Sequence, residues 1–430
     1  MTYAVVTFGC RVNQADSLAA EEALLGQGAT ATAPEQADVV IVNTCSVTAS
    51  ADQAARQTIR RLARVNPGAR IVVTGCYATR RPDELAALHG VAAVVPNDDK
   101  PALLQMLARP PVDDGDGACG ARIEPGVAGR TAFTLRVQTG CGEQCSYCVI
   151  PTTRGRPRSV PIDILLAEVA RVVDAGFKEI ALTGVHLGSY GRDLEPPSSL
   201  AGLMHALAGW IRSRRAASRQ ADVLFRVSSL EPMDCSPAVV DLVAGAGCFA
   251  PHLHLPLQHA SDRVLAAMRR PYTIDYYRRL VDAIRRRMPH ASIGSDVLVG
   301  FPGETEEDFA ELAAYLAGCP LTHLHVFPYS DRPGTSASAM AGKVHGTAVR
   351  ERARVVRDIG QRLTARFRAA QLGTVHRGLT IEDGALVVTG NYLKVQIPPG
   401  AARNEWVDVR VTGADGVMRG ELCLPVATRH

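Results

Sequence analysis

The chain has 430 residues, enough for two to four domains, and 47% of them are hydrophobic against 21% charged, the balance of a globular protein with a sizeable core. It holds no run of about 18 apolar residues and no N-terminal signal pattern, so we expect a cytoplasmic protein with no membrane partner. The net charge of +4 is too small to indicate a nucleic-acid partner by itself. The 11 cysteines are an odd number without a secretory signal, which argues against a disulfide scaffold and favours metal ligands or catalytic thiols.

Residues 1–110 alternate short apolar runs with helical patterns. The apolar runs are Tyr3–Phe8, Asp38–Asn43, Arg70–Thr74 and Val91–Val95, and the helical patterns include Asp16–Gly26 and Asp52–Val65. This βαβ rhythm predicts a doubly wound parallel sheet. The stretch that follows, residues 111–130, is rich in Pro, Gly and Asp and is typical of an interdomain linker.

A second βα series occupies residues 131–370. Its expected strands are Phe133–Gln138, Glu179–Thr183, Leu224–Ser228, His252–Leu257, Ile293–Val299 and His323–Pro328. Six βα units predict an open, partial (β/α)6 barrel, and an Arg-rich helix at 348–371 is expected to close this domain.

Residues 371–430 change to short strands between Gly, Pro and Asp turns, which predicts a small β-barrel. The strands expected here are Val375–Ile381, Ala385–Val388, Tyr392–Ile397 and Trp406–Thr412. The predicted fold class is therefore α/β with several domains: a doubly wound sheet, a partial barrel and a small terminal β-barrel.

Three cysteines lie close together in GCGEQCSYC, at Cys141, Cys145 and Cys148, directly after an expected strand. Thiolates are soft ligands that suit an iron–sulfur cluster or zinc. Three thiolates on one loop bind three irons of a 4Fe–4S cluster and leave the fourth iron open for a small molecule, whereas zinc needs a fourth Cys or His at regular spacing, and none is evident nearby. The stretch resembles the cluster motif of the radical S-adenosylmethionine (SAM) superfamily, and PTTRGRPRS at 151–159 resembles a segment of its methylthiotransferases.

Three further cysteines, Cys10, Cys45 and Cys76, each follow an expected parallel strand by one or two residues. The carboxyl ends of parallel strands meet at one edge of a sheet, where ligands bind, so this placement favours a metal site over three small buried hydrophobes. The segments around these cysteines resemble the N-terminal domain of methylthiotransferases. That resemblance implies a second 4Fe–4S cluster, whose open iron holds the sulfur to be inserted. The other five cysteines match no motif and are expected in the core, the linker or the surface.

Seven residues are candidates for the SAM pocket, because they lie at the ends of expected barrel strands or beside the cysteine triplet. A Gly-rich turn contributes two of them, since small residues let backbone carbonyls approach a ligand closely. HLPLQHAS at 254–261 and DVLVGFPGET at 296–305 resemble strand-end segments of the family. The seven candidates are Tyr147, Gly184, His186, Glu231, Gln258, Val299 and Tyr329. Glu231 fits a solvated helix cap equally well.

Arginines gather at 350–368 and 269–287, and also at 212–219, which we expect to form a loop-like insert. Such charges suit phosphate binding, although solvated helix faces explain them as well. The terminal barrel resembles the RNA-binding TRAM domain most closely at NYLKV (391–395). Its six basic residues are matched by six acidic ones, so it is not strongly basic. Such a barrel can still position single-stranded RNA by shape and stacking. The RNA-binding candidates are Arg154, Arg158, Arg352, Arg366 and Lys394.

The resemblance covers essentially the whole chain and is closest to the methylthiotransferases that act on N6-threonylcarbamoyladenosine 37 of tRNA, because FGCRVNQADS, NTCSVT, TGCYA, LTGVHLGSYG and LHVFPYSDRPGT match that branch. It implies two 4Fe–4S clusters and SAM as cofactors, and hydrogen abstraction and methylthio insertion at C2 of the base. The implied partners are the anticodon stem-loop and an electron donor such as flavodoxin or ferredoxin. No catalytic residue beyond the cluster ligands is implied.

Two kinds of alternative remain open. Within the family, the substrate could be N6-isopentenyladenosine 37 or a ribosomal protein. From a different class, the chain could be a non-catalytic, metal-stabilised RNA-binding protein, which would hold zinc and would not turn over SAM.

Overall fold

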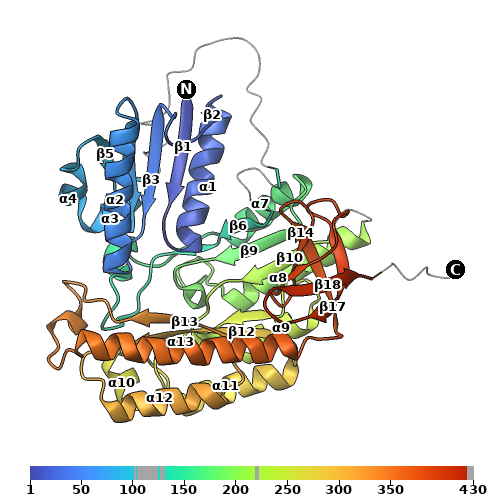
Figure 1. Ribbon diagram of the computed structural model, residues 1–430. Coiled ribbons are helices and arrows are strands. Elements are labelled where there is room, and N and C mark those ends of the chain that lie inside the picture. The colour runs from blue at the N-terminus through green and yellow to red at the C-terminus, as the bar shows by residue number, and fades with distance from the viewer. Residues whose placement is uncertain (101–102, 104–123, 126–130, 218–221, 424–430) are drawn as a thin grey trace.

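The computed structural model describes residues 1–100, 103, 124–125, 131–217 and 222–423. Most of the expected linker at 111–130, together with Cys119 and Arg219, lies outside the described residues. Figure 1 shows an N-terminal sheet above a larger α/β body, with a small barrel of strands at one end of that body. Within the described part of the chain, no helix is both long and apolar enough to cross a membrane.

The N-terminal sheet consists of five parallel strands in the order β2-β1-β3-β4-β5. Its elements are β1 (Thr2–Thr7), α1 (Arg11–Gly26), β2 (Thr30–Ala31), β3 (Val39–Thr44), α2 (Ala49–Val65), β4 (Arg70–Gly75), α3 (Cys76–Arg80), α4 (Pro82–Ala86), β5 (Val91–Val95) and the 3-10 turn η1 (Asn97–Asp99). Alternate residues of the buried strand β3 face opposite sides: Val40 and Val42 pack in the cluster that includes α2, whereas Ile41 packs with α1. Helices on both faces confirm the doubly wound prediction.

The central body contains six parallel strands in two groups of three, β10-β9-β6 and β11-β12-β13, joined by a bridge between Phe225 and Phe249. This is the open (β/α)6 barrel that the sequence predicts. The strands are β6 (Phe133–Arg136), β9 (Glu179–Thr183), β10 (Leu224–Val227), β11 (His252–His254), β12 (Ser292–Val299) and β13 (His323–Pro328). The long helices are α7 (Ile162–Asp174), α8 (Leu200–Ala216), α9 (Pro237–Gly245), α11 (Ile274–Arg287), α12 (Glu306–Gly318) and α13 (Gly346–Ala369). The short elements are β7 (Gln138–Thr139), α6 (Ile150–Arg154), β8 (Arg158–Ser159), η3 (Leu187–Ser189), η4 (Pro232–Asp234), α10 (Asp262–Ala267) and η5 (Ser336–Ala339).

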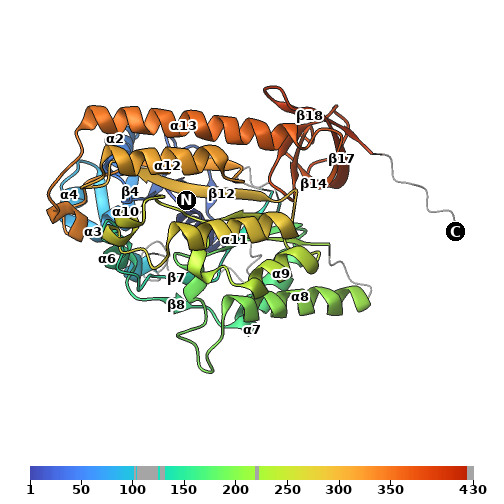
Figure 2. The same ribbon diagram turned by 90° about the horizontal axis from the view of Figure 1, so that it is seen from below.

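Helices cover one face of the β11-β12-β13 group. Figure 2 shows α12 and α13 side by side along β12, and Leu324 and Val326 of β13 pack in the core that contains Val356 and Ile359 of α13. Since successive residues of a strand point to opposite faces, the side chains of His323 and His325 lie on the other face. In Figure 1 that face is turned toward the N-terminal sheet.

The C-terminal strands close into a barrel in the order β14-β15-β16-β18-β17. They are β14 (Val375–Ile381), β15 (Leu386–Thr389), β16 (Lys394–Gln396), β17 (Trp406–Gly413) and β18 (Met418–Leu422). The first four lie within or close to the predicted runs. The sequence did not predict β18, because its residues MRGEL carry little apolar alternation, and its place in the sheet comes from pairing with β16 and β17.

The predicted loop-like insert at 212–219 is wrong where the structure describes it. Arg212, Arg214 and Arg215 lie on the last turns of α8, which begins at Leu200. The guanidinium of Arg214 stacks 4.9 Å from the ring centre of Trp210 and pairs with Asp174 at 2.6 Å. The helix therefore continues through a polar stretch, where Arg214 has partners on the preceding turn and on α7.

Candidate active site

The three N-terminal cysteines lie at the carboxyl ends of three adjacent strands. Cys10 caps α1 after β1, Cys45 follows β3, and Cys76 begins α3 after β4. Cys45 and Cys76 are buried, and Cys10 is exposed. Burial raises the pKa of Cys45 to about 11, and the charges of Cys76 and Cys10 add to that effect. The three thiols therefore lie close enough to interact, and a shared metal group would replace their protons.

Gly9 allows this close arrangement. Its backbone has φ +90°, and a Cβ at this position would lie 2.6 Å from Cβ and 2.7 Å from Sγ of Cys45. Such contacts are closer than real Cβ atoms make, and L-residues avoid this φ. Only glycine lets Cys10 and Cys45 approach each other here.

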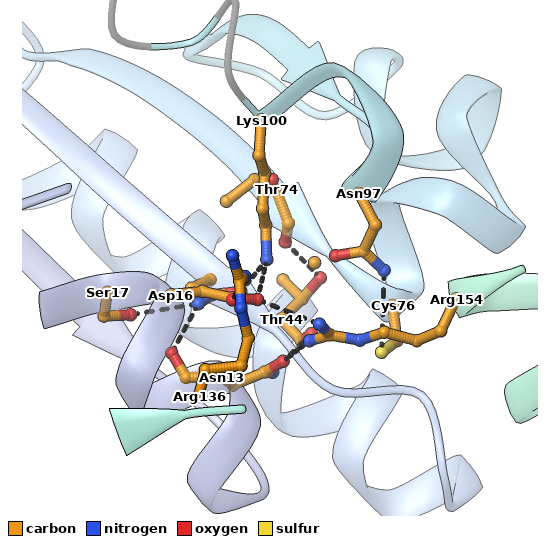
Figure 3. Close-up of polar contacts among 12 residues, drawn as sticks. Asn13, Asp16, Ser17, Thr44, Thr74, Cys76, Asn97, Lys100, Arg136 and Arg154 are labelled. Carbon is orange, nitrogen blue, oxygen red and sulfur yellow. Dashed lines mark hydrogen bonds and ion pairs between the residues drawn. The ribbon is translucent and has the colours of Figure 1, made fainter. Parts of the chain in front are cut away.

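A group of charged residues lies beside Cys76 of the N-terminal triplet, and Figure 3 shows this group. Lys100, Arg136 and Arg154 converge on Asp16, with Nζ of Lys100 2.5 Å and Nη1 of Arg154 3.0 Å from its carboxylate. Burial opposes ionisation of Asp16, but these three cations outweigh it and lower its pKa to about 2. A cavity of about 420 Å³ opens beside this group.

Two buried arginines of the central body bind the N-terminal segment beside its cysteines. Arg154 pairs with Asp16 and also donates a hydrogen bond to the side chain of Asn13, which lies three residues before Asp16 on the same side of α1. Arg332 donates to the carbonyl of Ser46 at 2.7 Å and to the carboxylate of Asp52 at 2.7 Å. Ser46 directly follows Cys45, so these contacts fix the position of the N-terminal triplet relative to the barrel.

The second triplet lies on the loop between β7 and α6. Burial raises the pKa of Cys148 to about 12, and the charges of Cys145 and Cys141 contribute, so these thiols also lie together. Nη1 of Arg270 donates to Sγ of Cys145 at 3.3 Å, and Arg270 also forms an ion pair with Glu231. The loop thus presents three thiols and a buried cation that stabilises their thiolate forms, which fits a cluster of soft metal ions.

Polar residues from the ends of β9 and β10 border the second triplet. Nε2 of His186 lies 2.8 Å from Asp234, and its backbone N–H donates to Gln138 at 2.9 Å. Burial opposes protonation of His186, but hydrogen bonds with Asp234 and Cys141 raise its pKa to about 10. A Cβ on Gly184 would lie 3.0 Å from the Gln138 amide oxygen, so the predicted Gly-rich turn is tightly packed.

The remaining SAM-pocket candidates are placed as follows. Tyr147 packs edge-on to Phe301 at 6.5 Å between ring centres, and Phe301 packs edge-on to Tyr329 at 5.8 Å. Gln258 has φ +65° and bridges to Val297, two residues before Val299 at the end of β12. Such a backbone conformation is uncommon for a residue other than glycine, and it is frequent at ligand sites.

The RNA-binding candidates differ in accessibility. The side chain of Arg158 is 54% exposed and pairs with Asp98, and Lys394 is exposed. Arg154 is only 3% exposed and held by Asp16, and Arg352 is 5% exposed and held by Glu304 and Glu306. Buried and paired guanidinium groups are not available to phosphate, so the structure argues against RNA contact by Arg154 and Arg352. Arg366 donates to the carbonyl of Cys319.

Sequence reasoning missed a group of rings on the face of β11 and β13 that is turned away from α13. His252, His254, His323 and His325, which we call the histidine row, have neighbouring ring centres 5.0 to 6.0 Å apart. Gly294 of β12 leaves room for the rings, since a Cβ there would lie 2.1 Å from the ring of His323. The alternation HLH at 252–254 and at 323–325 is the signal that could have revealed it.

Asp296 holds the end of the histidine row. Its carboxylate lies 2.8 Å from Nε2 of His254 and 3.2 Å from Nδ1 of His325. The ligand atoms of the three residues lie within 4.8 Å of one another, a spacing that a metal ion could bridge. In the structure the carboxylate is satisfied by the two imidazoles.

Comparisons with known proteins agree with this architecture. Residues 2–96 match the family model described as "Uncharacterized protein family UPF0004", and residues 135–316 match the radical SAM superfamily. The structure of the radical SAM methyltransferase TsrM from Kitasatospora setae superposes with a TM-score of 0.56 at 17% identity, covering 78% of this chain and 76% of that one, which shows a shared fold. The radical SAM match includes the second cysteine triplet, and this superfamily works with a 4Fe–4S cluster and SAM.

Full-length relatives identify the family. The chain is 36% identical over 407 residues to the threonylcarbamoyladenosine tRNA methylthiotransferase MtaB of Aquifex aeolicus, covering 92% of this chain and 96% of that protein. It is 36% identical over 362 residues to MtaB of Bacillus subtilis, covering 82% and 78%. It is 33% identical over 403 residues to the ribosomal protein uS12 methylthiotransferase RimO of Acidothermus cellulolyticus, covering 86% and 82%. The chain therefore belongs to the radical SAM methylthiotransferases, and it is an enzyme of that family.

Proposed function

We propose that this enzyme adds a methylthio group to C2 of N6-threonylcarbamoyladenosine 37 in tRNA. Two lines of support carry the proposal. Relatives from five bacteria whose names specify this substrate align over 82% to 95% of the chain. The single structural observation behind it is that two separate cysteine triplets lie on one chain, one at the edge of the N-terminal sheet and one at the mouth of the barrel.

We assign Cys141, Cys145 and Cys148 to the 4Fe–4S cluster that binds SAM. A cluster of this kind, together with SAM, supplies a 5′-deoxyadenosyl radical for hydrogen abstraction. The residues of this chain prepare the site: Arg270 stabilises the thiolate of Cys145, and Glu231 holds Arg270 in place. Placement beside the triplet or at strand ends also supports the seven SAM-pocket candidates as cofactor contacts.

His186 has a positioning role in this proposal. Asp234 and Gln138 fix its ring and backbone, and its raised pKa keeps it protonated at neutral pH. A protonated imidazole beside Cys141 supplies positive charge where the thiolates carry negative charge.

We assign Cys10, Cys45 and Cys76 to a second 4Fe–4S cluster, at which the inserted sulfur is held. Three thiolates leave one position on a four-iron group without a protein ligand. Gly9 brings the thiols together, and Arg154 and Arg332 fix their segment against the barrel. The charges of Cys76 and Cys10, in turn, raise the pKa of Arg154 against the effect of burial, so this arginine remains a permanent counter-charge.

The proposed partners are the tRNA anticodon stem-loop and an electron donor such as flavodoxin or ferredoxin. Arg158, Arg366 and Lys394 are the accessible cations among the predicted RNA contacts, and the terminal barrel resembles a domain that binds RNA. Phosphate contacts of this kind predict binding that weakens as salt increases.

Two measurements test the proposed function. Iron and sulfide analysis of anaerobically purified enzyme should give roughly eight irons per chain, the content of two 4Fe–4S clusters, whereas zinc would indicate the non-catalytic alternative. Mass spectrometry of tRNA nucleosides from a deletion strain should then show loss of the methylthio-threonylcarbamoyl nucleoside. Unchanged tRNA, or loss of a different methylthio product, would contradict the assigned substrate.

A further inference from the structure

A hydrogen bond joins the N-terminal segment to the C-terminal barrel beside the first cysteine triplet. Arg11, the residue after Cys10, donates from Nη2 to the hydroxyl of Tyr392 at 3.3 Å. Tyr392 lies between β15 and β16, and the residue is 43% exposed. The ring of Tyr392 lies 4.7 Å from His252, so it extends the histidine row toward Arg11.

Tyr392 is held rigidly. Its backbone has φ +66°, and its N–H donates to the carbonyl of Thr389. The guanidinium of Arg226 lies 4.7 Å from the centre of the tyrosine ring and donates to the carbonyl of Gly390 at 3.0 Å. A non-glycine residue keeps such a conformation only where its surroundings fix it, and fixed residues of this kind are found in ligand sites.

Arg11 differs from the other arginines around the triplets. Arg226 is fully buried and donates two hydrogen bonds to the carboxylate of Glu179. Each of the other three, Arg154, Arg270 and Arg332, forms an ion pair with a carboxylate. In the described part of the chain, Arg11 has no carboxylate within ion-pair distance, and it is only partly buried. Its charge is therefore available to an anionic group that enters beside Cys10.

We infer that Arg11 binds the carboxylate of the threonylcarbamoyl group, with the adenine placed over the histidine row. This inference rests on the proposed function and identifies the residue that recognises the threonylcarbamoyl substituent. The substituent carries the one negative charge on the modified base, and a guanidinium matches the geometry of a carboxylate. The histidine row is accessible at His325, whose side chain is 58% exposed, and this ring offers a flat face for a purine.

The placement also fits the reaction. Arg11 is adjacent in sequence to Cys10, which we assign to the sulfur-holding cluster, and it contacts the terminal barrel that we expect to bind RNA. A base whose substituent is held by Arg11 therefore lies within reach of the N-terminal triplet. Arg11 acts here as a specificity-determining residue, since an uncharged substituent would leave its guanidinium without a partner.

The test uses two anticodon stem-loop RNAs and the holoenzyme. One RNA carries N6-threonylcarbamoyladenosine, and in the other a carboxamide replaces the carboxylate. For wild-type enzyme, we expect KM for methylthiolation to be about tenfold to a hundredfold higher with the carboxamide RNA, the range of a charge-assisted hydrogen bond. Arg11→Gln should raise KM for the carboxylate RNA by a similar factor. For the carboxamide RNA, Arg11→Gln should have the same KM as the wild-type enzyme. Arg11→Lys should recover part of the difference.

The iron content of each variant is one control. The other is the variant Arg357→Gln, which changes an exposed arginine of α13, behind the sheet. Arg357→Gln should leave both KM values unchanged. If Arg11→Gln raises KM equally for both RNAs, Arg11 does not read the carboxylate and the inference fails while the proposed function stands. If wild-type enzyme modifies neither RNA, the proposed function fails and this inference fails with it.

Discussion

The two cysteine triplets of this enzyme are built in opposite ways. Cys141, Cys145 and Cys148 lie on one loop of eight residues, whereas the N-terminal cysteines come from three strand ends separated by 35 and 31 residues. The loop can present its thiols wherever the barrel places it. The N-terminal triplet exists only when β1, β3 and β4 pair in register, so its ligands depend on the whole sheet.

This difference has consequences for the surroundings of each triplet. The loop triplet has its cation, Arg270, from the same domain. The N-terminal triplet receives Arg154 and Arg332 from the central body. The site at the sheet edge is therefore sensitive to how the two domains pack, and substitutions at the interface should affect it more than the loop.

The largest expected effects are those of cysteine substitutions, which should affect SAM cleavage and methylthio transfer differently in the two triplets. Cys145→Ala should abolish formation of 5′-deoxyadenosine and of the methylthio product, because the loop loses one of its three thiolates. Cys10→Ala should leave SAM cleavage partly intact and lose the methylthio product. Both products are measured by mass spectrometry after reduction of the enzyme, with Cys423→Ala, outside both triplets, as the control. Retention of SAM cleavage in Cys145→Ala would show that the assignment is wrong.

A glycine substitution tests the close approach at the sheet edge. Gly9→Ala should remove roughly half of the bound iron, that of one of two clusters, because its Cβ would collide with Cys45. Gly28→Ala is the matched control: it has φ +75° and nothing within 4 Å of the added Cβ. Both variants carry the same backbone strain, about 1 kcal/mol, so only a steric effect at the triplet separates their iron contents.

Removing an interface arginine should destabilise the N-terminal segment. Arg332→Ala removes one of the two arginines that pair with Asp52 and deletes two contacts to Ser46. The loss of one partner from a buried ion pair costs about 3 kcal/mol, which denaturant unfolding would detect. The matched substitution Arg354→Ala removes two exposed ion pairs within α13, with Glu351 and Asp358. It should change the free energy of unfolding far less than Arg332→Ala does.

The smallest expected effect is on acid stability. The folded-state pKa of Asp16 is about 2 against an ordinary value of 3.8, so its ionised form stabilises the fold above about pH 4. This contribution, about 2 kcal/mol, is lost as pH falls from about 4 to about 2. Asp16→Asn should remove that part of the acid dependence when unfolding is followed against pH. An acid profile identical to that of the wild type would show that the three cations do not act through this carboxylate.

Sequence patterns predicted most of the fold because burial follows simple periodicities. The apolar run at 39–44 became the fully buried strand β3, and six apolar runs at similar spacing became the barrel. The patterns failed where apolar content was low, at β18 and in the last turns of α8. There, strand pairing and side-chain stacking stabilise segments that look polar in isolation.

The sequence by itself determined which chemistry this protein can perform. Spacing identified one thiol triplet, and strand position suggested the other, because ligand type and parallel-strand direction are local properties. Only the tertiary structure decided how charge is distributed around these thiols. Arg154 and Arg352, predicted to bind RNA, are buried in ion pairs, whereas Arg11, beside Cys10, has no carboxylate partner among the residues that the structure describes. An arginine has the same local signature whether it is paired or free, and its partners come from segments far away in the chain.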